Sequence, residues 1–417
     1  MRILLLPLIA LALGRLIPTE LGMISVHTAV GATIGDVLYF SHAAFGLMQG
    51  HPPYQPNFLT RPDQGLPYVY PPLTLLISLP AVLGESHFLA AFSIEILFVS
   101  LGGCGMLGYF ARRLGVVGPV GLATAVLLAA SGPVWLTRVD SIQGLLVAGS
   151  ALALVGGRRT LAVVLVTLAC LVKETAVLAA VPVGLWCLLP DGENPLPWPQ
   201  RVRELLLGLV PALLIFGAFL VWSSGGEVTS SLTSVHRGME LESIPASVAI
   251  ALSHFAPVHS YLGGLGSEQL RASDASILAI SAIALGTIVI GVGSVLLAQG
   301  HRHPATAIAM AVAVGLCATP VLSPQYLLDL LPVLAIAAYA DFPRTLGDRL
   351  MLLGLLLAVL TQAEFPYLFS SVVALQPSGL VALLLRNALL LLVAAILTWR
   401  IPWSRLGALV PDREQEA

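Results

Sequence analysis

Charge is the property that this sequence has least of. Of its 417 residues, 10% are charged and 57% are hydrophobic, and the mean hydropathy is +0.92. A soluble domain has about 25% charged residues, so the composition excludes a soluble globular protein and predicts an integral membrane protein. The apolar runs do not alternate with polar residues, which excludes the strands of an outer-membrane barrel. We therefore expect an all-α polytopic membrane protein.

Cysteines and the familiar catalytic motifs are equally scarce. The four cysteines lie inside apolar runs without close spacing: Cys104, Cys170, Cys187 and Cys317. Such positions are typical of small buried hydrophobic residues rather than of disulfides or metal ligands. No HExxH, P-loop, GxSxG or DxD sequence occurs. A metal-dependent nucleotide-sugar site therefore has little support, and no metal or cofactor is expected.

What the sequence has in abundance is apolar runs of roughly 17–25 residues, which as helices cross about 30 Å of hydrocarbon. They predict one integral membrane domain, residues 1–417, with about 11–13 transmembrane helices. The run 1–18 lacks a small-residue cleavage site and is interpreted as the first helix rather than a signal peptide. The later predicted spans are 88–110, 116–137, 141–156, 160–172, 174–189, 205–222, 275–298, 304–320, 324–340, 350–369 and 379–400.

Arginine clusters predict the orientation, because basic residues favour cytoplasmic loops. The clusters are Arg112-Arg113, Arg158-Arg159, Arg201/Arg203, Arg302, Arg344/Arg349 and Arg400/Arg405. Placing them inside puts both termini in the cytoplasm of a cell-membrane protein. It also requires the proline-containing segment 67–84 to stay outside as an interfacial or re-entrant helix. The expected regions are an external loop 19–87, a helical core 88–222, an external loop 223–274, C-terminal helices 275–401 and a cytoplasmic tail 402–417.

The first polar constellation lies in VGATIGDVLYFSHAAFGLMQGHPPY, residues 30–54. Asp36 is either a solvated loop acid that caps a helix or a carboxylate at the membrane surface that accepts a proton from a substrate hydroxyl. His42, His51 and Tyr54 in the same loop would orient a polar substrate.

Two further constellations lie at breaks between apolar runs. Arg138 and Asp140 either form an ion pair in a tight turn or bring a cation and a second acid to the face of Asp36. Lys173 is the only lysine in the chain and is followed by Glu174. An ionisable group at membrane depth usually faces a cavity or a partner. Lys173 therefore either pairs with Glu174 or supplies a fixed cation for an anionic substrate.

A fourth constellation lies in the second external loop. His236, Arg237 and Glu240 would share one face if this segment is helical. They form either a solvated amphipathic helix or an anion clamp, in which Glu240 and Glu242 hold the guanidinium or a hydroxyl.

A fifth constellation follows an external turn between two prolines. Gln325 and Tyr326 open the next helix and Asp329 lies one turn deeper. This is either a proline-punctuated helix start or a part of the substrate site. Other isolated polar residues are interpreted as structural: Glu95, Glu364, His301 and His303.

Together these segments resemble the glycosyltransferase family 87 proteins of the GT-C superfamily. The resemblance is carried by DVLYFSHAAFGLMQGHPPY with YVYPPLTLLISLP, RVDSIQGLLVAGSALAL, VKET, HRGMELES and SPQYLLDLLP, in family order over roughly residues 1–340. Members are polytopic enzymes that use polyprenyl-phosphate sugars, typically mannose, on the external membrane face. The resemblance implies a GT-C-like bundle whose long external first loop carries interfacial helices.

The resemblance also implies roles for individual residues. Asp36 matches the proposed general base, and Arg237 would sit near the donor phosphate, with His236, Lys173 and Arg138 as further phosphate-binding candidates. The base would deprotonate an acceptor hydroxyl as it attacks the anomeric carbon, and the cations would stabilise the departing polyprenyl phosphate. A single displacement inverts the anomeric centre. The residues expected to bind the substrates are Asp140, His42, His51, Tyr54, Tyr68, Tyr70, Glu240, Glu242, Gln325 and Tyr326.

The expected partners are a polyprenyl-phosphate sugar, a glycolipid or lipid-linked glycan acceptor, and membrane lipids, with no nucleic acid. Mannose follows from the resemblance, and arabinose or another polyprenyl-linked sugar stays open. Two other functions stay open as well. One is a transporter or flippase for a polyprenyl-linked substrate, although the repeated halves common in transporters are not evident. The other is an inactive GT-C-like scaffold.

Overall fold

The computed structural model describes residues 31–55, 58–59, 68–190, 196–226, 238–253, 258–262, 267–272, 275–299 and 303–403. It is mostly helical, as expected. Within these described residues, five segments are long and apolar enough to cross a membrane: α4 (Phe88–Arg113), α10 (Trp198–Trp222), α13 (Ala275–Gln299), α16 (Arg344–Gln362) continued by the π-helix η5 (Ala363–Tyr367), and α18 (Pro377–Thr398). These segments agree with an all-helical membrane protein.

The other predicted spans within the described residues also form helices, but shorter ones. They are α5 (Val120–Ala130) with α6 (Pro133–Leu136), α7 (Asp140–Val155), α8 (Arg159–Val172), η3 (Glu174–Ala176) with α9 (Val177–Leu188), α14 (Pro304–Ala318), and η4 (Pro324–Tyr326) with α15 (Leu327–Ala340). Helix α8 has 14 residues, which at 1.5 Å per residue gives a length of about 21 Å. A hydrocarbon core is about 30 Å thick. The number of membrane crossings therefore stays a prediction.

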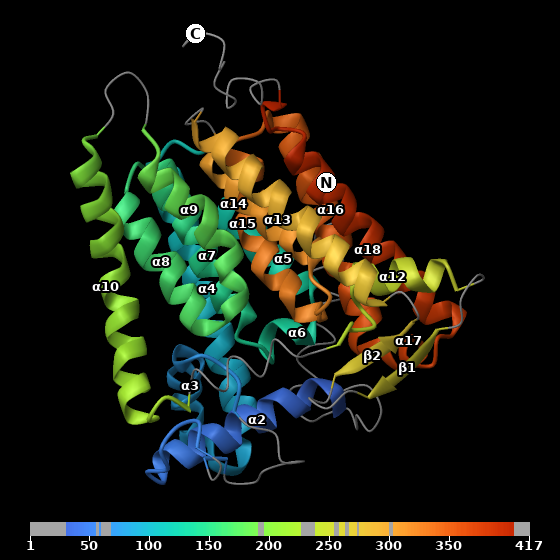
Figure 1. Cartoon of the computed structure of the whole chain (residues 1–417). Coiled ribbons are helices and arrows are strands. Elements are labelled where there is room, and N and C mark those ends of the chain that lie inside the picture. The colour runs from blue at the N-terminus through green and yellow to red at the C-terminus, as the bar shows by residue number, and fades with distance from the viewer. Residues whose placement is uncertain are drawn as a thin grey trace, which may run out of the picture.

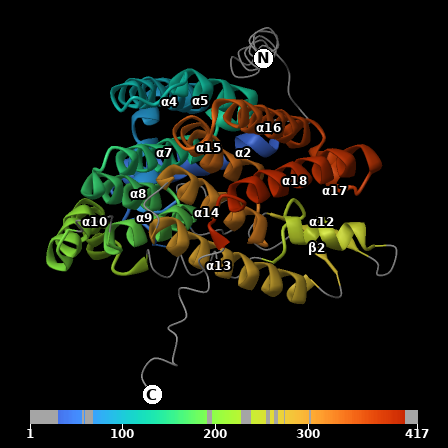
Figure 2. The ribbon, with the colours of Figure 1, turned by 90° about the horizontal axis from the view of Figure 1, so that it is seen from above.

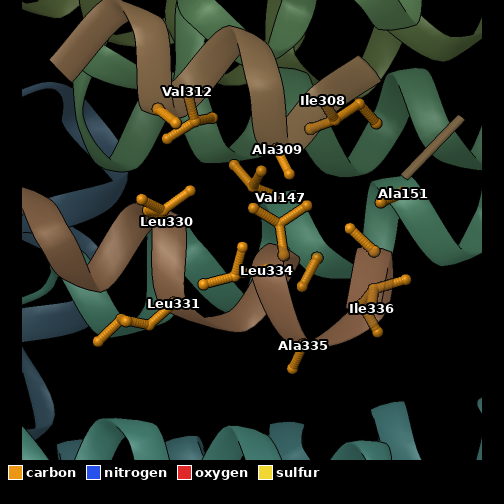
Figure 3. Packing of buried hydrophobic residues seen from close by; sticks show 14 of the residues in the cluster. Val147, Ala151, Ile308, Ala309, Val312, Leu330, Leu331, Leu334, Ala335 and Ile336 are labelled. Carbon is orange, nitrogen blue, oxygen red and sulfur yellow. The ribbon is translucent and has the colours of Figure 1, made fainter. Parts of the chain in front are cut away.

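The centre of the bundle is built from α7, α14 and α15, which are buried along almost their whole length. Small and branched side chains of these three helices pack together there (Figure 3). Small residues let helix backbones approach closely. A Cβ atom on Gly144 would lie 2.1 Å from the carbonyl oxygen of Leu328, so α7 and α15 nearly touch near their first turns. Figure 2 shows α10 and α13 at the periphery.

The two ends of the bundle differ in their chemistry. At one end the Asp341 carboxylate accepts hydrogen bonds from the N–H and hydroxyl of Thr306 at 2.7 and 2.9 Å, and its carbonyl accepts one from Arg400 at 2.7 Å. These bonds join the start of α14, the end of α15 and the chain after α18. The opposite end, which we name the loop end, carries α2 (Gly31–Met48), α3 (Pro72–Ser78), α12 (Ile244–Ala251) and a β-hairpin (Figure 1). The orientation of these ends in a membrane stays a prediction.

The predicted interfacial segment 67–84 forms two short helices at the loop end. These are α3, of seven residues, and the start of the 3-10 helix η2 (Pro80–His87), of eight residues. Both are too short to cross a membrane. The buried hydroxyl of Thr74 donates to the carbonyl of Val172 and ties α3 to the end of α8. Helix α2 lies across the loop end (Figure 1) and contacts α3 and α4.

The predicted external loop 223–274 contains α12 and an antiparallel hairpin that the sequence did not predict. Strands β1 (His259–Leu262) and β2 (Glu268–Arg271) pair with Ser260 opposite Leu270. Glu240 adds an isolated antiparallel bridge to Gln269. Four-residue strands are too short to give a clear alternating pattern, which explains why the hydropathy of this loop did not predict them.

Candidate functional site

A break in the helical chain at Lys173 defines the candidate site. Helix α8 ends at Val172, and Lys173 has an extended backbone with φ −158° and ψ 140° before η3 begins. This turn lies at the loop end of the bundle, and the Lys173 side chain is only 5% exposed. A buried ammonium needs a partner because desolvation disfavours its charge.

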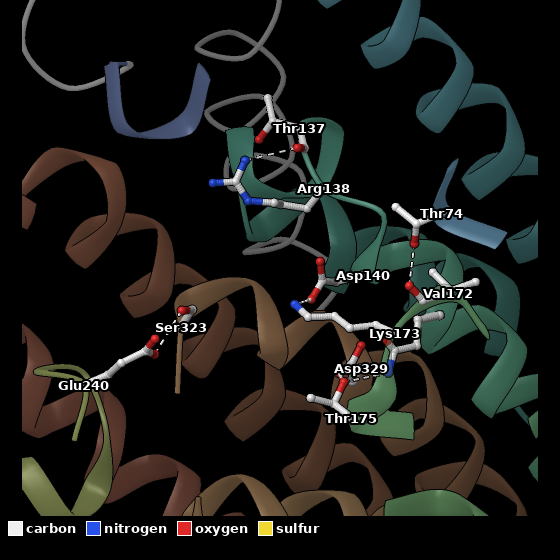
Figure 4. Close-up of polar contacts among 11 residues, drawn as sticks. Thr74, Thr137, Arg138, Asp140, Val172, Lys173, Thr175, Glu240, Ser323 and Asp329 are labelled. Atoms are coloured by element: carbon white, nitrogen blue, oxygen red, sulfur yellow. Dashed lines mark hydrogen bonds and ion pairs between the residues drawn. The ribbon is translucent and has the colours of Figure 1, made fainter. Parts of the chain in front are cut away.

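Asp140 is that partner. The Lys173 Nζ atom lies 2.6 Å from Oδ1 of Asp140, the first residue of α7, where a negative charge is favoured by the helix dipole. The same Nζ lies 3.9 Å from the ring centroid of Tyr326, a cation–π distance. Glu174 is exposed. The ion pair thus joins two of the predicted constellations, and the carboxylate 2.6 Å from the Lys173 ammonium belongs to Asp140 (Figure 4).

Hydrogen-bond acceptors surround this ion pair. The Thr175 hydroxyl donates to Oδ2 of Asp329 at 3.0 Å and accepts from the Gln143 amide at 2.7 Å. Among the described residues, Oδ1 of Asp329 and Oε1 of Gln143 are buried without a hydrogen-bond partner. Buried acceptors of this kind require a donor, and the hydroxyl groups of a sugar supply such donors.

Arg138 lies beside the pair but points elsewhere. Its side chain is 3% exposed, and Nη1 donates to the carbonyl of Thr137 at 3.1 Å. Figure 4 shows its guanidinium directed away from the Lys173–Asp140 pair. Among the described residues the loop end therefore holds the buried cations Lys173 and Arg138.

Glu240 contacts the turn before α15. Glu240 is 1% exposed, and its Oε2 accepts from the Ser323 hydroxyl at 3.1 Å. Gln325 and Tyr326 are also buried. Burial raises the pKa of the Glu242 carboxyl well above its usual range, and the nearby negative charge of Glu364 raises it further.

The predicted substrate-binding tyrosines pack against one another. Tyr68 is 2% exposed, and its ring centroid lies 5.5 Å from those of Tyr39 and Tyr54 and 6.1 Å from that of Tyr70. The Tyr54 hydroxyl donates to the carbonyl of Tyr70 at 2.8 Å. Burial of an aromatic cluster stabilises the loop that carries it. Its rings therefore join α2 to the described residues on either side of this cluster, Tyr54 and Tyr68 to Tyr70.

The remaining predicted residues belong to α2, to the chain after it and to the segment before Gly238. His236 and Arg237 lie outside the described residues. Asp36 lies in α2, but its side chain is outside the described part of the structure. His42 and His51 are half-buried at the loop end. The grouping of Asp36 with Asp140 and Arg237 stays a prediction.

One buried polar cluster was missed by the sequence analysis. Arg386, in the middle of α18, and Glu364, in η5, are both 0% exposed, with Nε of the arginine 2.9 Å from Oε2 of the glutamate. Asn387 follows and is also buried. The signal was an Arg-Asn pair inside an apolar run, because an ionisable group there requires a partner.

In the part of the chain that the structure describes, no three His, Cys, Asp or Glu side chains are grouped as a metal site requires. A metal-independent mechanism stays a prediction. Comparisons of the chain with protein-family models, with curated proteins and with solved structures give no significant match.

Proposed function

We propose that this chain is a membrane glycosyltransferase. It would move a sugar, with mannose as the first candidate, from a polyprenyl-phosphate donor to a hydroxyl of a glycolipid or lipid-linked glycan at the external membrane face. The observation that supports it most is the buried Lys173–Asp140 pair at the loop end, lined by the free acceptors of Asp329 and Gln143. The family resemblance supplies the reaction type.

The donor phosphate needs cations, and the geometry limits what Lys173 offers. An ammonium has three N–H donors, and Asp140 takes one of them at 2.6 Å. Lys173 thus keeps donors for a phosphate oxygen, but its charge is largely balanced. A second cation is required, and Arg138 or Arg237 would supply it. Cations around a leaving phosphate stabilise the charge that develops as the sugar departs.

The proposed reaction is one displacement. The acceptor oxygen attacks the anomeric carbon, its proton passes to the Asp36 carboxylate, and the bond between the anomeric carbon and the phosphate oxygen breaks. The products are a glycoside and polyprenyl phosphate, and the anomeric configuration inverts. A β-linked donor therefore gives an α-glycoside. Free acceptors at Asp329 and Gln143 would orient sugar hydroxyls.

The test is incubation of the purified protein with polyprenyl-phosphate-mannose and a membrane lipid extract, followed by mass and linkage analysis of the lipids. A new mannosylated lipid with the inverted configuration is expected. Glu174→Gln is the matched control, because it removes an exposed acid next to Lys173 and should leave transfer unchanged. An unmodified donor that crosses the bilayer of proteoliposomes would instead support a flippase.

A further inference from the structure

A fully buried arginine lies where the proposed reaction does not use it. Arg386 is the largest fully buried side chain among the described residues, and its Nε contacts Glu364 Oε2 at 2.9 Å. Hydrophobic residues of similar volume hold helices together at least as well as a buried ion pair does. Packing of α18 against the end of α16 therefore does not by itself explain why a charged arginine is buried at position 386.

The arginine and its neighbour hold the main chain of the external loop. Nη2 of Arg386 donates to the carbonyl of Glu242 at 2.6 Å, and Nδ2 of Asn387 donates to the same carbonyl at 3.1 Å. The Asn387 amide also donates to the Ser247 hydroxyl at 2.6 Å. Ser243, between them, caps the start of α12. Two adjacent side chains of α18 thus fix the chain as it enters α12.

Two residues before Glu242, the same loop contacts the candidate site through Glu240. The N–H of Glu240 donates to the carbonyl of Pro320 at 2.8 Å, and its carboxylate accepts from the Ser323 hydroxyl at 3.1 Å. Ser323 directly precedes η4, which carries Tyr326. The Tyr326 ring lies over the Lys173 ammonium. Figure 4 shows the Glu240–Ser323 contact in one view with the Lys173–Asp140 pair and separate from it.

We propose that Arg386 and Asn387 are positioning residues for this site. They fix the chain that enters α12, that chain fixes Glu240, and Glu240 holds the turn that places Tyr326 over Lys173. A catalytic consequence rests on the proposed function, whereas the packing of the lysine does not. The two parts can therefore be tested separately.

The experiment uses the fact that Lys173 is the only lysine. Reductive methylation of the full-length protein with ¹³C-formaldehyde gives one dimethyl-lysine NMR signal, distinct from that of the N-terminal amine and assigned by its loss in Lys173→Arg. The ring current of Tyr326 shifts this signal upfield. The labelling rate reports how often the buried ammonium opens to solvent.

Two variants interrupt the proposed chain of contacts without removing the buried charge. Ser323→Ala deletes the hydroxyl that binds the Glu240 carboxylate, and Asn387→Ala deletes a hydrogen bond to the Glu242 carbonyl. We expect both to speed labelling by about tenfold and to reduce the upfield shift. Ser260→Ala is the matched control, because it also deletes a serine hydrogen bond between the loop and the bundle, to the Val373 carbonyl at 2.7 Å. It should change neither readout.

Unchanged labelling in both Ser323→Ala and Asn387→Ala would overturn the proposal. An equal change in Ser260→Ala would also overturn it, since that result means general loosening of the loop. Arg386→Lys keeps a cation beside Glu364 but lacks the guanidinium's second donor group, so it should resemble Asn387→Ala. A wild-type rate and shift in the lysine variant would contradict a role for the guanidinium.

Turnover separates this proposal from the proposed function. A folded wild-type protein that transfers no sugar overturns the glycosyltransferase proposal, whatever the labelling shows. Where the wild type does transfer sugar, kcat should fall in Ser323→Ala and Asn387→Ala with little change in Ser260→Ala. A fall in kcat with an unchanged lysine signal would contradict positioning through Lys173.

Discussion

The buried ion pair between Lys173 and Asp140 gives the sharpest test of the structure. Removing one partner of a buried pair costs about 3–5 kcal/mol, because the other charge is left unpaired. Both side chains are almost fully buried, at 5% and 1% exposure. Single substitutions at either position should therefore lower the free energy of unfolding by amounts in that range.

The two single variants should differ. In Asp140→Asn the ammonium keeps the Tyr326 ring at 3.9 Å, a contact worth about 2 kcal/mol when desolvated. In Lys173→Met the buried Asp140 carboxylate loses its cation. We expect a loss of about 3 kcal/mol for Asp140→Asn and about 5 kcal/mol for Lys173→Met, with the double variant losing much less than the sum.

Urea titration of the protein in detergent micelles measures these differences, provided that the slope of the transition is unchanged. Glu174→Gln serves as the control, since its carboxylate is exposed and its loss should change stability by less than about 0.5 kcal/mol. Single variants within that margin of the wild type, or an additive double variant, would refute a buried pair between Lys173 and Asp140.

Three further outcomes are expected. Gly144→Ala should destabilise the bundle by more than about 2 kcal/mol in the same urea titration, because its Cβ would overlap the Leu328 carbonyl. Gly217→Ala is the control and should be neutral or stabilising, because open space surrounds Gly217. The pKa of Glu242 is raised in the folded protein, so the folded state keeps its proton where the unfolded state loses it, above a pH of about 4.3. Thermal stability should therefore fall as the pH rises from this value toward the folded pKa. Glu242→Gln should flatten that part of the pH profile. Thr74→Val should leave the carbonyl at the end of α8 without its donor, costing about 1–3 kcal/mol and accelerating hydrogen exchange in α3.

The sequence predicted the helices correctly because a long apolar run has few other stable conformations in a membrane. It did not predict where the helices begin and end. Helix α10 begins at Trp198 and α16 at Arg344, several residues before the predicted starts at 205 and 350. Their first turns carry arginines, which hydropathy counts as loop although their long stems can lie along a helix. Helix ends therefore depend on side-chain packing that composition does not report.

The candidate site shows what pairing information a single sequence lacks. The break at Lys173 could be singled out because a lone lysine in an apolar run needs a partner. Asp140 is 33 residues away, and choosing it over the adjacent Glu174 required the packing of α7 against α8. Arg386 and Glu364 were missed as a pair for the same reason, since neither has a complementary charge nearby in sequence.

The most direct test of the central proposal is sugar transfer by Asp36→Asn compared with the wild type. Asp348→Asn is the control, because it removes a half-buried acid in α16. In purified protein supplied with polyprenyl-phosphate-mannose and lipid extract, the wild type and the control should form the mannosylated lipid. Asp36→Asn should bind the donor but form no product. Wild-type transfer by Asp36→Asn would contradict its role as the base, and no transfer by the folded wild type would contradict the proposed function.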